Sequence, residues 1–252
     1  AGFIQLIYRT SHDDGKRLVS HPAIGASGYT GSRSAGSQLK EAADRVGKPI
    51  YLELSSINPI YILPGAIRER SAALAEQFAS SCLMGVGQFC TNPGLVVVRA
   101  GTDTEDWIRQ VAERFQAAPV GTLLGPSVQS HLETGVQTLV TNGATLVTGG
   151  ASGGGTGYCC QNTLLRVSGS KFVASPAALQ TEAFGNASLI VVVESDAEFI
   201  SVTQALEGNL TGCLYTANDG SDDPLYDQIA PILRQKVGRL LNDKMPTGVA
   251  VV

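Results

Sequence analysis

Apolar and polar positions alternate along the chain in blocks that predict strands followed by helices. Short apolar runs rich in β-branched residues predict strands at residues 3–8, 23–31, 49–56, 59–64, 94–99, 144–150, 162–168, 187–194, 210–217 and 237–243. Apolar residues three or four positions apart predict helices at residues 11–21, 32–48, 68–85, 103–118, 127–143, 196–208 and 224–236. Strands alternating with helices of this length predict an α/β fold, with a mainly parallel sheet covered by helices on both faces.

Local signals refine this pattern at a few positions. Ser11 is a candidate cap for the first helix, and Gly47 with Pro49 should end the second. The runs at 49–56 and 59–64 are expected to be buried strands. The glycine-rich stretch 149–157 predicts a flexible surface loop.

Length and composition limit the number of domains and the classes of partner that are compatible with this chain. At 252 residues the chain exceeds the usual domain size of roughly 100–150, which favours one large or two smaller domains. A net charge of −4 without a basic run argues against nucleic acid and anionic membrane as partners. No apolar run approaches the roughly 20 residues of a membrane span.

Cysteine and histidine usage points to a reducing compartment and to no metal site. The five cysteines lack the spacing of a disulfide framework, so we expect free thiols and a cytoplasmic location. The three histidines, His12, His21 and His131, have no metal-ligand spacing with a cysteine, which argues against zinc.

One cysteine differs from the others in its surroundings. Cys90 lies in "GVGQFCTNPG", a polar and glycine-flanked connection after a predicted helix, whereas the other four lie in apolar or loop contexts typical of packing residues. A nucleophilic cysteine needs a lowered pKa or a nearby base. The residues alone leave two interpretations of Cys90 open, a nucleophile or a small packing residue.

Two glutamates are ambiguous in the same way. Glu53 lies inside the apolar run "YLELSS", where desolvation would raise its pKa toward that of a general base, unless it faces water at a strand edge. Glu182 in "TEAFGN" is either functional or part of a surface turn.

A glycine turn is a candidate phosphate site. In "GYTGSRSAG", Gly31 and Ser32 follow a predicted strand and open a predicted helix, where backbone N–H groups and the helix dipole favour anions. A simple packing turn would have the same pattern, and the spacing is neither the dinucleotide fingerprint nor a Walker loop.

Taken together, these motifs resemble those of the aldehyde dehydrogenase superfamily. "YLELSSINP" is similar to its glutamate motif, "GVGQFCTNPG" to its cysteine motif and "TEAFGNASLIVV" to its Glu-x-Phe-Gly motif, in the family's order and with separations of 37 and 92 residues from Glu53 to Cys90 to Glu182. "GYTGSRSAG" matches the family's turn beside the cofactor pyrophosphate, and the similarity extends over essentially the whole chain.

Within the superfamily the chain most resembles the 2,5-dioxopentanoate (α-ketoglutarate semialdehyde) dehydrogenases, followed by the NADP-dependent fatty aldehyde dehydrogenases. It departs from the common pattern at two places. Ser55, Ser56 and Ile57 stand where most members have Gly-Gly-Lys, and Asn186 stands where proline is usual.

The resemblance implies a catalytic role for two residues. Cys90 would attack the aldehyde to form a thiohemiacetal, which hydride loss converts to a thioester. Glu53 would activate the water that hydrolyses this thioester. The Cys90 backbone N–H would form half of an oxyanion hole.

It also implies a binding site for NAD or NADP. Gly31 and Ser32 would approach the pyrophosphate, Leu54 would contact the nicotinamide side through its backbone, Glu182 would bind the nicotinamide ribose, and Phe184 would pack near the ring.

Family members run to nearly twice this length, so the chain is expected to be a fragment. Residues 1–54 would be the last part of a Rossmann-type cofactor domain and residues 55–252 the catalytic domain of a homo-oligomer, with an aldehyde as small-molecule partner. Alone, the chain should bind NAD(P) poorly. The alternative is a truncated or degenerate relative that performs no redox chemistry and serves as a structural or interaction piece.

Overall fold

The computed structural model describes residues 2–8 and 10–248, and the chain divides into two compact units, Ala1–Ser55 and Ser56–Val252. This division falls one residue after the predicted domain boundary. The assignment of the two units to cofactor binding and catalysis stays a prediction.

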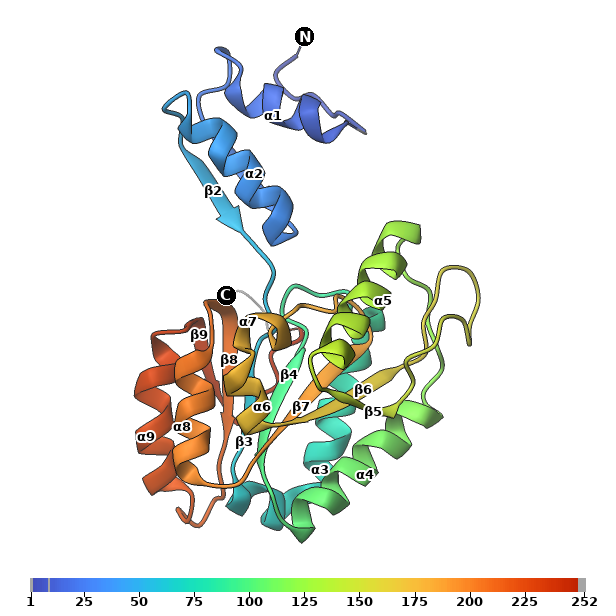
Figure 1. The fold of residues 1–252 in the computed structure, drawn as a ribbon, viewed down its shortest axis with the longest axis vertical. Coiled ribbons are helices and arrows are strands. Elements are labelled where there is room, and N and C mark those ends of the chain that lie inside the picture. Colours follow the sequence, from blue (N-terminus) through green and yellow to red (C-terminus); the bar gives the residue numbers. More distant parts are fainter. Residues whose placement is uncertain (1, 9, 249–252) are drawn as a thin grey trace. The chain divides into compact units, whose positions relative to one another are not determined.

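The first unit is a small strand–helix–strand arrangement with one additional helix (Figure 1). Its elements are α1 His12–Ser20, β1 Ser27–Thr30, α2 Arg33–Asp44 and β2 Ile50–Glu53. The two strands pair in parallel, as expected for strands joined by a crossover helix. Ser11 caps α1 as predicted, because its Oγ accepts a hydrogen bond from the Asp14 N–H at 3.1 Å.

Two sequence predictions in this unit are wrong. Residues 3–8 do not form a strand, since no ladder of the described chain includes them and Phe3, Ile4 and Tyr8 are exposed. An apolar run becomes a strand only when another strand satisfies its backbone groups. The run at 49–56 forms β2, but β2 is not a buried strand, because its side chains alternate and Tyr51 is 73% exposed.

The second unit is built on a seven-stranded sheet with the order β5-β6-β7-β4-β3-β8-β9. All neighbours pair in parallel except β5 and β6, which are antiparallel. The strands are β3 Ile60–Ile62, β4 Leu95–Arg99, β5 Thr145–Thr148, β6 Thr163–Ser168, β7 Ala187–Val193, β8 Asn209–Tyr215 and β9 Val237–Asn242. The predicted α/β fold with a mainly parallel sheet is confirmed.

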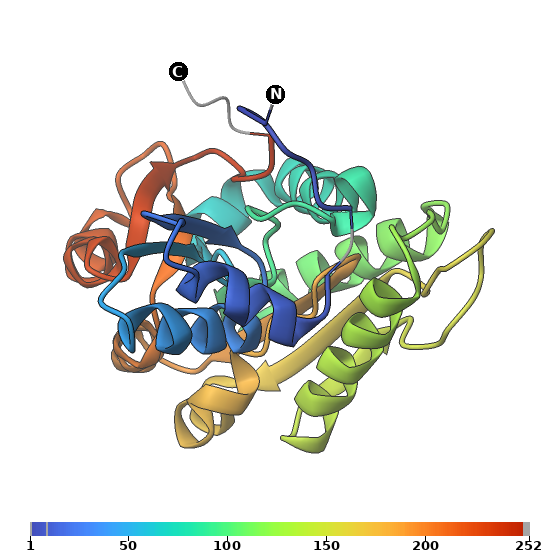
Figure 2. The same ribbon diagram turned by 90° about the horizontal axis from the view of Figure 1, so that it is seen from above.

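Helices cover both faces of this sheet (Figure 2), which produces three layers. The helical elements are α3 Pro64–Leu83, the 3-10 turn η1 Met84–Gly87, α4 Thr102–Ala117, α5 Pro126–Thr141, α6 Gly169–Ala174, α7 Pro176–Leu179, α8 Asp196–Ala205 and α9 Asp223–Arg234. Helices α3 and α4 pack on one face, while α5 to α9 contribute to the core of the other.

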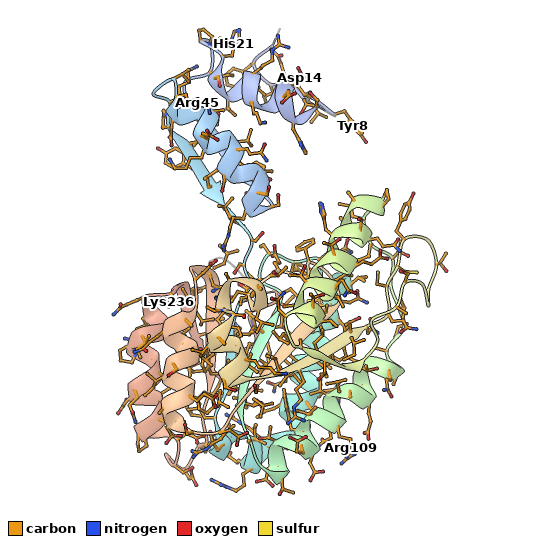
Figure 3. The ribbon with its side chains drawn as sticks, in the orientation of Figure 1. Tyr8, Asp14, His21, Arg45, Arg109 and Lys236 are labelled. Carbon is orange, nitrogen blue, oxygen red and sulfur yellow. The ribbon has the colours of Figure 1, made fainter. Side chains whose placement is uncertain are left out.

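The alternation of side chains along each strand divides the interior into two cores. In β4, Val97 joins the core under α5 to α9, whereas Val96 and Val98 join the core under α3 and α4. Both sets are fully buried, which explains why the central strands are continuous apolar runs rather than alternating ones. Charged residues lie on the outer helix faces instead, as Arg109 of α4 does in Figure 3, where it pairs with Glu113 four residues later.

The glycine-rich stretch 149–157 forms the predicted surface loop. It closes as a hairpin through an isolated antiparallel bridge between Ser152 and Cys160 and a 2.8 Å hydrogen bond from the Gly153 N–H to the Cys159 carbonyl.

Parallel strands bring the segments that precede them to one edge of the sheet. The stretch 56–59 leads into β3, residues 84–94 lead into β4, and residues 181–186 lead into β7, and these three strands are close neighbours. The predicted cysteine and Glu-x-Phe-Gly motifs therefore meet at the amino ends of the central strands.

Candidate active site

Cys90 is the exposed thiol of this chain. It lies in the turn between η1 and β4, while Cys82, Cys159, Cys160 and Cys213 are buried, as their apolar contexts predicted. All five thiols are free. Because rapid attack on a substrate requires access to the sulfur, the structure favours Cys90 over the other four as a nucleophile.

The backbone just before Cys90 has an unusual conformation. Gly85, Val86 and Gly87 all have positive φ, at 56°, 60° and 66°. Positive φ in a β-branched residue is a genuine outlier, and such conformations persist where the surrounding structure fixes them. Gly87 is required for a second reason, since a Cβ at this position would lie 2.0 Å from the Gly185 carbonyl oxygen.

The segment after Cys90 is tied to the sheet on both sides. The Ser188 hydroxyl donates to the Pro93 carbonyl at 2.8 Å, and the Gly94 N–H donates to the Ile57 carbonyl at 2.9 Å. The Asn92 side-chain amide donates to the Gly185 carbonyl at 3.3 Å. These bonds attach the cysteine loop to both neighbouring segments, so it is a fixed part of the scaffold.

Glu182 and Phe184 lie beside this loop. The Glu182 carboxylate accepts a hydrogen bond from the Ser56 backbone N–H at 3.3 Å. Both residues line a pocket together with Ser56, Phe89 and Asn92, so the neighbours of Cys90 form part of the wall. The structure thus brings the predicted cysteine motif and the predicted Glu-x-Phe-Gly motif together.

The other four candidate residues cluster in the first unit, at the carboxyl ends of β1 and β2. The Gly31 N–H donates to the Glu53 carbonyl at 3.0 Å, and the Ser32 hydroxyl caps α2 by accepting from the Ala35 N–H at 3.3 Å. Leu54 packs against α2, where a Cβ on Gly36 would lie 2.3 Å from its methyl group.

Glu53 is the last residue of β2 and its side chain is exposed. The sequence left two interpretations of Glu53 open, a desolvated base or a carboxylate that faces water. Within the first unit the carboxylate faces water. The proposed role of Glu53 as a base therefore rests on the family resemblance.

Gly31 allows the Tyr29 ring to lie close to the backbone at the start of α2. A Cβ at this position would lie 2.6 Å from the Tyr29 hydroxyl, so only glycine fits without a shift of that ring. The N-terminus of a helix suits a phosphate group, which makes the predicted pyrophosphate contact compatible with the position of Gly31 and Ser32 at the start of α2.

Comparison with known proteins gives these motifs a family. Residues 1–229 match the model of the Aldehyde dehydrogenase family. The chain belongs to this family. It is 38% identical to alpha-ketoglutaric semialdehyde dehydrogenase 2 of Azospirillum brasilense, over 100% of this chain and 48% of that protein. It is 29% identical to alpha-ketoglutaric semialdehyde dehydrogenase of Acinetobacter baylyi, over 94% and 45%.

The chain therefore spans about half the length of the curated relatives it matches. Solved aldehyde dehydrogenases share its fold. Lactaldehyde dehydrogenase from Escherichia coli superimposes with a TM-score of 0.76 at 22% identity, covering 94% of this chain and 49% of that one. Betaine aldehyde dehydrogenase from Staphylococcus aureus, in complex with NAD+, gives 0.74 at 18% identity, covering 90% and 45%.

The two departures from the family pattern have structural explanations in this aldehyde dehydrogenase chain. The Ser56 hydroxyl accepts a hydrogen bond from the Leu210 N–H at 3.0 Å and so attaches its segment to β8. Asn186 is fully buried and donates to the Cys160 carbonyl at 2.9 Å and to the Asn162 side chain at 2.7 Å. The amide of Asn186 thus fixes the start of β7 through hydrogen bonds.

The residues that hold the cysteine loop were not predicted from the sequence. Asn58 is the clearest case, since its amide nitrogen donates to the Cys90 and Asn92 carbonyls, each at 2.9 Å. The available signal was a polar residue before proline inside the apolar run "SSINPIYI", which points to a buried and hydrogen-bonded side chain.

Two kinds of feature are absent from the described residues. No helix among them combines the length and apolar character needed to cross a bilayer. Nowhere in that part of the chain do three or more histidine, cysteine, aspartate or glutamate side chains form a group that could hold a metal ion.

Proposed function

We propose that this chain carries the nucleophile of an NAD(P)-dependent aldehyde dehydrogenase. The observation that carries the proposal is the placement of Cys90, an exposed thiol on a fixed loop beside the pocket that Glu182 and Phe184 line. Family membership supports the same reaction.

In the proposed reaction the Cys90 thiolate adds to the aldehyde carbonyl carbon, whose oxygen gains a proton to give a thiohemiacetal. The Cys90 backbone N–H stabilises the oxyanion as it forms. When bound, a nicotinamide cofactor would supply the acceptor for the hydride of the thiohemiacetal carbon, and the hydroxyl proton would leave to solvent, so that a thioester remains on Cys90. Glu53 takes a proton from water, which attacks this thioester and releases the carboxylate product and the thiol.

The residues that would hold the cofactor are those of the two clusters. Gly31 and Ser32 would approach the pyrophosphate at the N-terminus of α2, and Leu54 would contact the nicotinamide side. Glu182 would bind the nicotinamide ribose and Phe184 would pack near the ring. Either NAD or NADP is compatible with these residues.

The proposed substrate is a semialdehyde, with 2,5-dioxopentanoate first. Its support is the 38% identity to an alpha-ketoglutaric semialdehyde dehydrogenase over the whole of this chain. The free thiols fit a cytoplasmic enzyme, and we propose a homo-oligomer when the natural protein is complete.

Burst kinetics on the full natural protein test this function. With 2,5-dioxopentanoate and NAD(P), Cys90→Ser should form no NAD(P)H, because no thiohemiacetal forms. Glu53→Gln should give a burst of about one equivalent of NAD(P)H followed by a slow steady state, since thioester hydrolysis lacks its base. Cys160→Ser, at a buried thiol, should behave like wild type.

Normal turnover by Cys90→Ser would refute the nucleophile. Absence of NAD(P)H from the wild-type protein with every aldehyde tried would favour the alternative, a relative without redox activity.

A further inference from the structure

Asn58 combines complete burial with a strained backbone. Its exposed fraction is 0% and its φ is 45°. Pro59 follows it, and a residue before proline normally adopts an extended conformation. Asparagine tolerates the left-handed region better than most residues do, and such a conformation persists where the surroundings fix it.

The amide nitrogen of Asn58 holds the nucleophile loop by its backbone. It donates to the carbonyls of Cys90 and Asn92, both at 2.9 Å. These two carbonyls flank Thr91, so one side chain fixes both ends of the turn that presents the Cys90 thiol. An amide has two N–H donors, and both are used in this way.

The amide oxygen is anchored on the opposite side. It accepts from the Ser56 hydroxyl at 2.9 Å and from the Thr211 hydroxyl of β8 at 2.9 Å. Reversing the amide would direct its oxygen at two carbonyl oxygens and its nitrogen at the donors, so the network admits one orientation only.

A second asparagine connects the same segment to β8. The Asn209 side-chain oxygen accepts from the Ile57 N–H at 2.8 Å and from the Asn58 N–H at 3.2 Å. Asn209 begins β8, which pairs with β3 on one side and with β9 on the other. The position of Asn58 is therefore set by the rigid sheet rather than by a loop.

The geometry points to Asn58 as a positioning residue for the reaction of Cys90. It transmits the fixed position of β8 to the Cys90 carbonyl and so sets the direction in which the thiol meets the aldehyde. This inference rests on the proposed function. A displacement of the reacting atom by about 1 Å can slow a reaction roughly a hundredfold. Loss of the Asn58 hydrogen bonds to the cysteine loop should therefore slow the reaction of Cys90.

Asn58→Asp tests the inference because it keeps the shape and the anchored oxygen but replaces both donors with a carboxylate oxygen facing two carbonyls. In the full natural protein we expect hydride transfer in a single turnover to slow at least tenfold, with the aldehyde KM changed less than threefold. Hydrogen exchange in residues 86–94 should accelerate, because the loop loses the two hydrogen bonds that the Asn58 amide donates to it.

The pH dependence separates positioning from a general loss of structure. Burial disfavours the ionised form of the carboxyl group that Asn58→Asp introduces, so the pKa of this group should rise, and on acidification it regains one O–H donor toward the loop. The rate deficit relative to wild type at the same pH should therefore shrink as the pH falls. Cys90 and Glu182 belong to segments that hydrogen-bond to Asn58 and to Ser56, and both are present in the two proteins, so the wild-type pH profile is the reference for this comparison.

Asn162→Asp is a matched control. The Asn162 amide nitrogen also donates to two backbone carbonyls, those of Phe115 at 3.0 Å and Ala118 at 3.1 Å, and its oxygen also accepts from a side chain. The same substitution there should lower stability while leaving hydrogen exchange in residues 86–94 and the single-turnover rate within twofold of wild type.

The outcomes are distinct. The inference is supported if the single-turnover rate falls tenfold in Asn58→Asp but not in Asn162→Asp, and if this loss of rate shrinks at low pH. It is overturned if both variants lose the same rate, or if hydrogen exchange in residues 86–94 is unchanged in Asn58→Asp. If the wild type makes no NAD(P)H, the proposed function fails, and the exchange result still decides whether Asn58 fixes the loop. If Asn58→Asp does not fold, Thr211→Val, which removes one anchor, should accelerate the same exchange, and no acceleration overturns the inference.

Discussion

At the scale of single residues, exposure separates Cys90 from the other four thiols, and burial raises the pKa of three of those four. Burial raises the pKa of Cys213 to about 12 and that of Cys82 well above its usual range. Burial, with a further contribution from the Glu133 carboxylate, raises the pKa of Cys160 to about 11. At pH 8 a thiol with a pKa of about 11 is roughly 0.1% thiolate, so these three sulfurs are weak nucleophiles.

Iodoacetamide labelling should reveal this difference. At pH 8 we expect Cys90 to be alkylated first, because its sulfur is exposed and the others are buried. Raising the pH toward 11 should increase labelling of Cys160 about tenfold per pH unit, since deprotonation makes the nucleophile. Peptide mass spectrometry of the native protein measures each rate. Labelling of Cys82 or Cys213 as fast as Cys90 at pH 8 would contradict the expectation.

At the scale of elements, helix α3 shows how a distant residue completes a helix. Its N-cap Leu63 offers no side-chain cap, yet the N–H groups of Gly65 and Ala66 donate to the Asp222 carboxylate at 2.8 and 2.9 Å. Asp222 is buried and also accepts from the Ala217 N–H at 2.9 Å. A negative charge at the helix N-terminus also interacts favourably with the helix dipole.

Asp222→Asn should therefore destabilise the protein by about 1–3 kcal/mol, because charge-assisted hydrogen bonds and the dipole interaction are weakened. Denaturant unfolding followed by circular dichroism measures the loss. The exposed Asp227 in α9 provides the control, and Asp227→Asn should change stability by less than about 0.5 kcal/mol. Equal effects of the two substitutions would show that Asp222 does not cap α3.

At the scale of the whole chain, the two units differ in how much apolar surface they bury. The sheet of the second unit separates two extensive cores. In the described part of the first unit, Val19 and Ala43 are the buried apolar side chains. Regions with few buried apolar contacts open at low free energy.

Limited proteolysis of the chain should accordingly cut first within residues 1–55. The sheet of residues 56–248 should persist as a resistant product, because its strands open only with its cores. Mass spectrometry of the early fragments identifies the cut sites. Initial cuts in β4 or β7 would contradict this order.

The sequence by itself determined the alternation of strands and helices in the second unit and the exceptional character of Cys90. Apolar periodicity and turn residues are local signals, and both act within a few residues. The same local signals failed at residues 3–8, where strand formation depends on a pairing partner that periodicity does not contain.

Only the tertiary structure decided what surrounds Cys90. Asn58 and Ser188 donate to the cysteine loop, and Asn209 holds Asn58 in turn. These three segments meet because parallel pairing places the amino ends of β3, β4, β7 and β8 at one edge of the sheet. Gly87 is required by the approach of Gly185, 98 positions later in the chain. Contacts of this kind depend on strand order, which is a property of the folded chain and not of any single stretch of sequence.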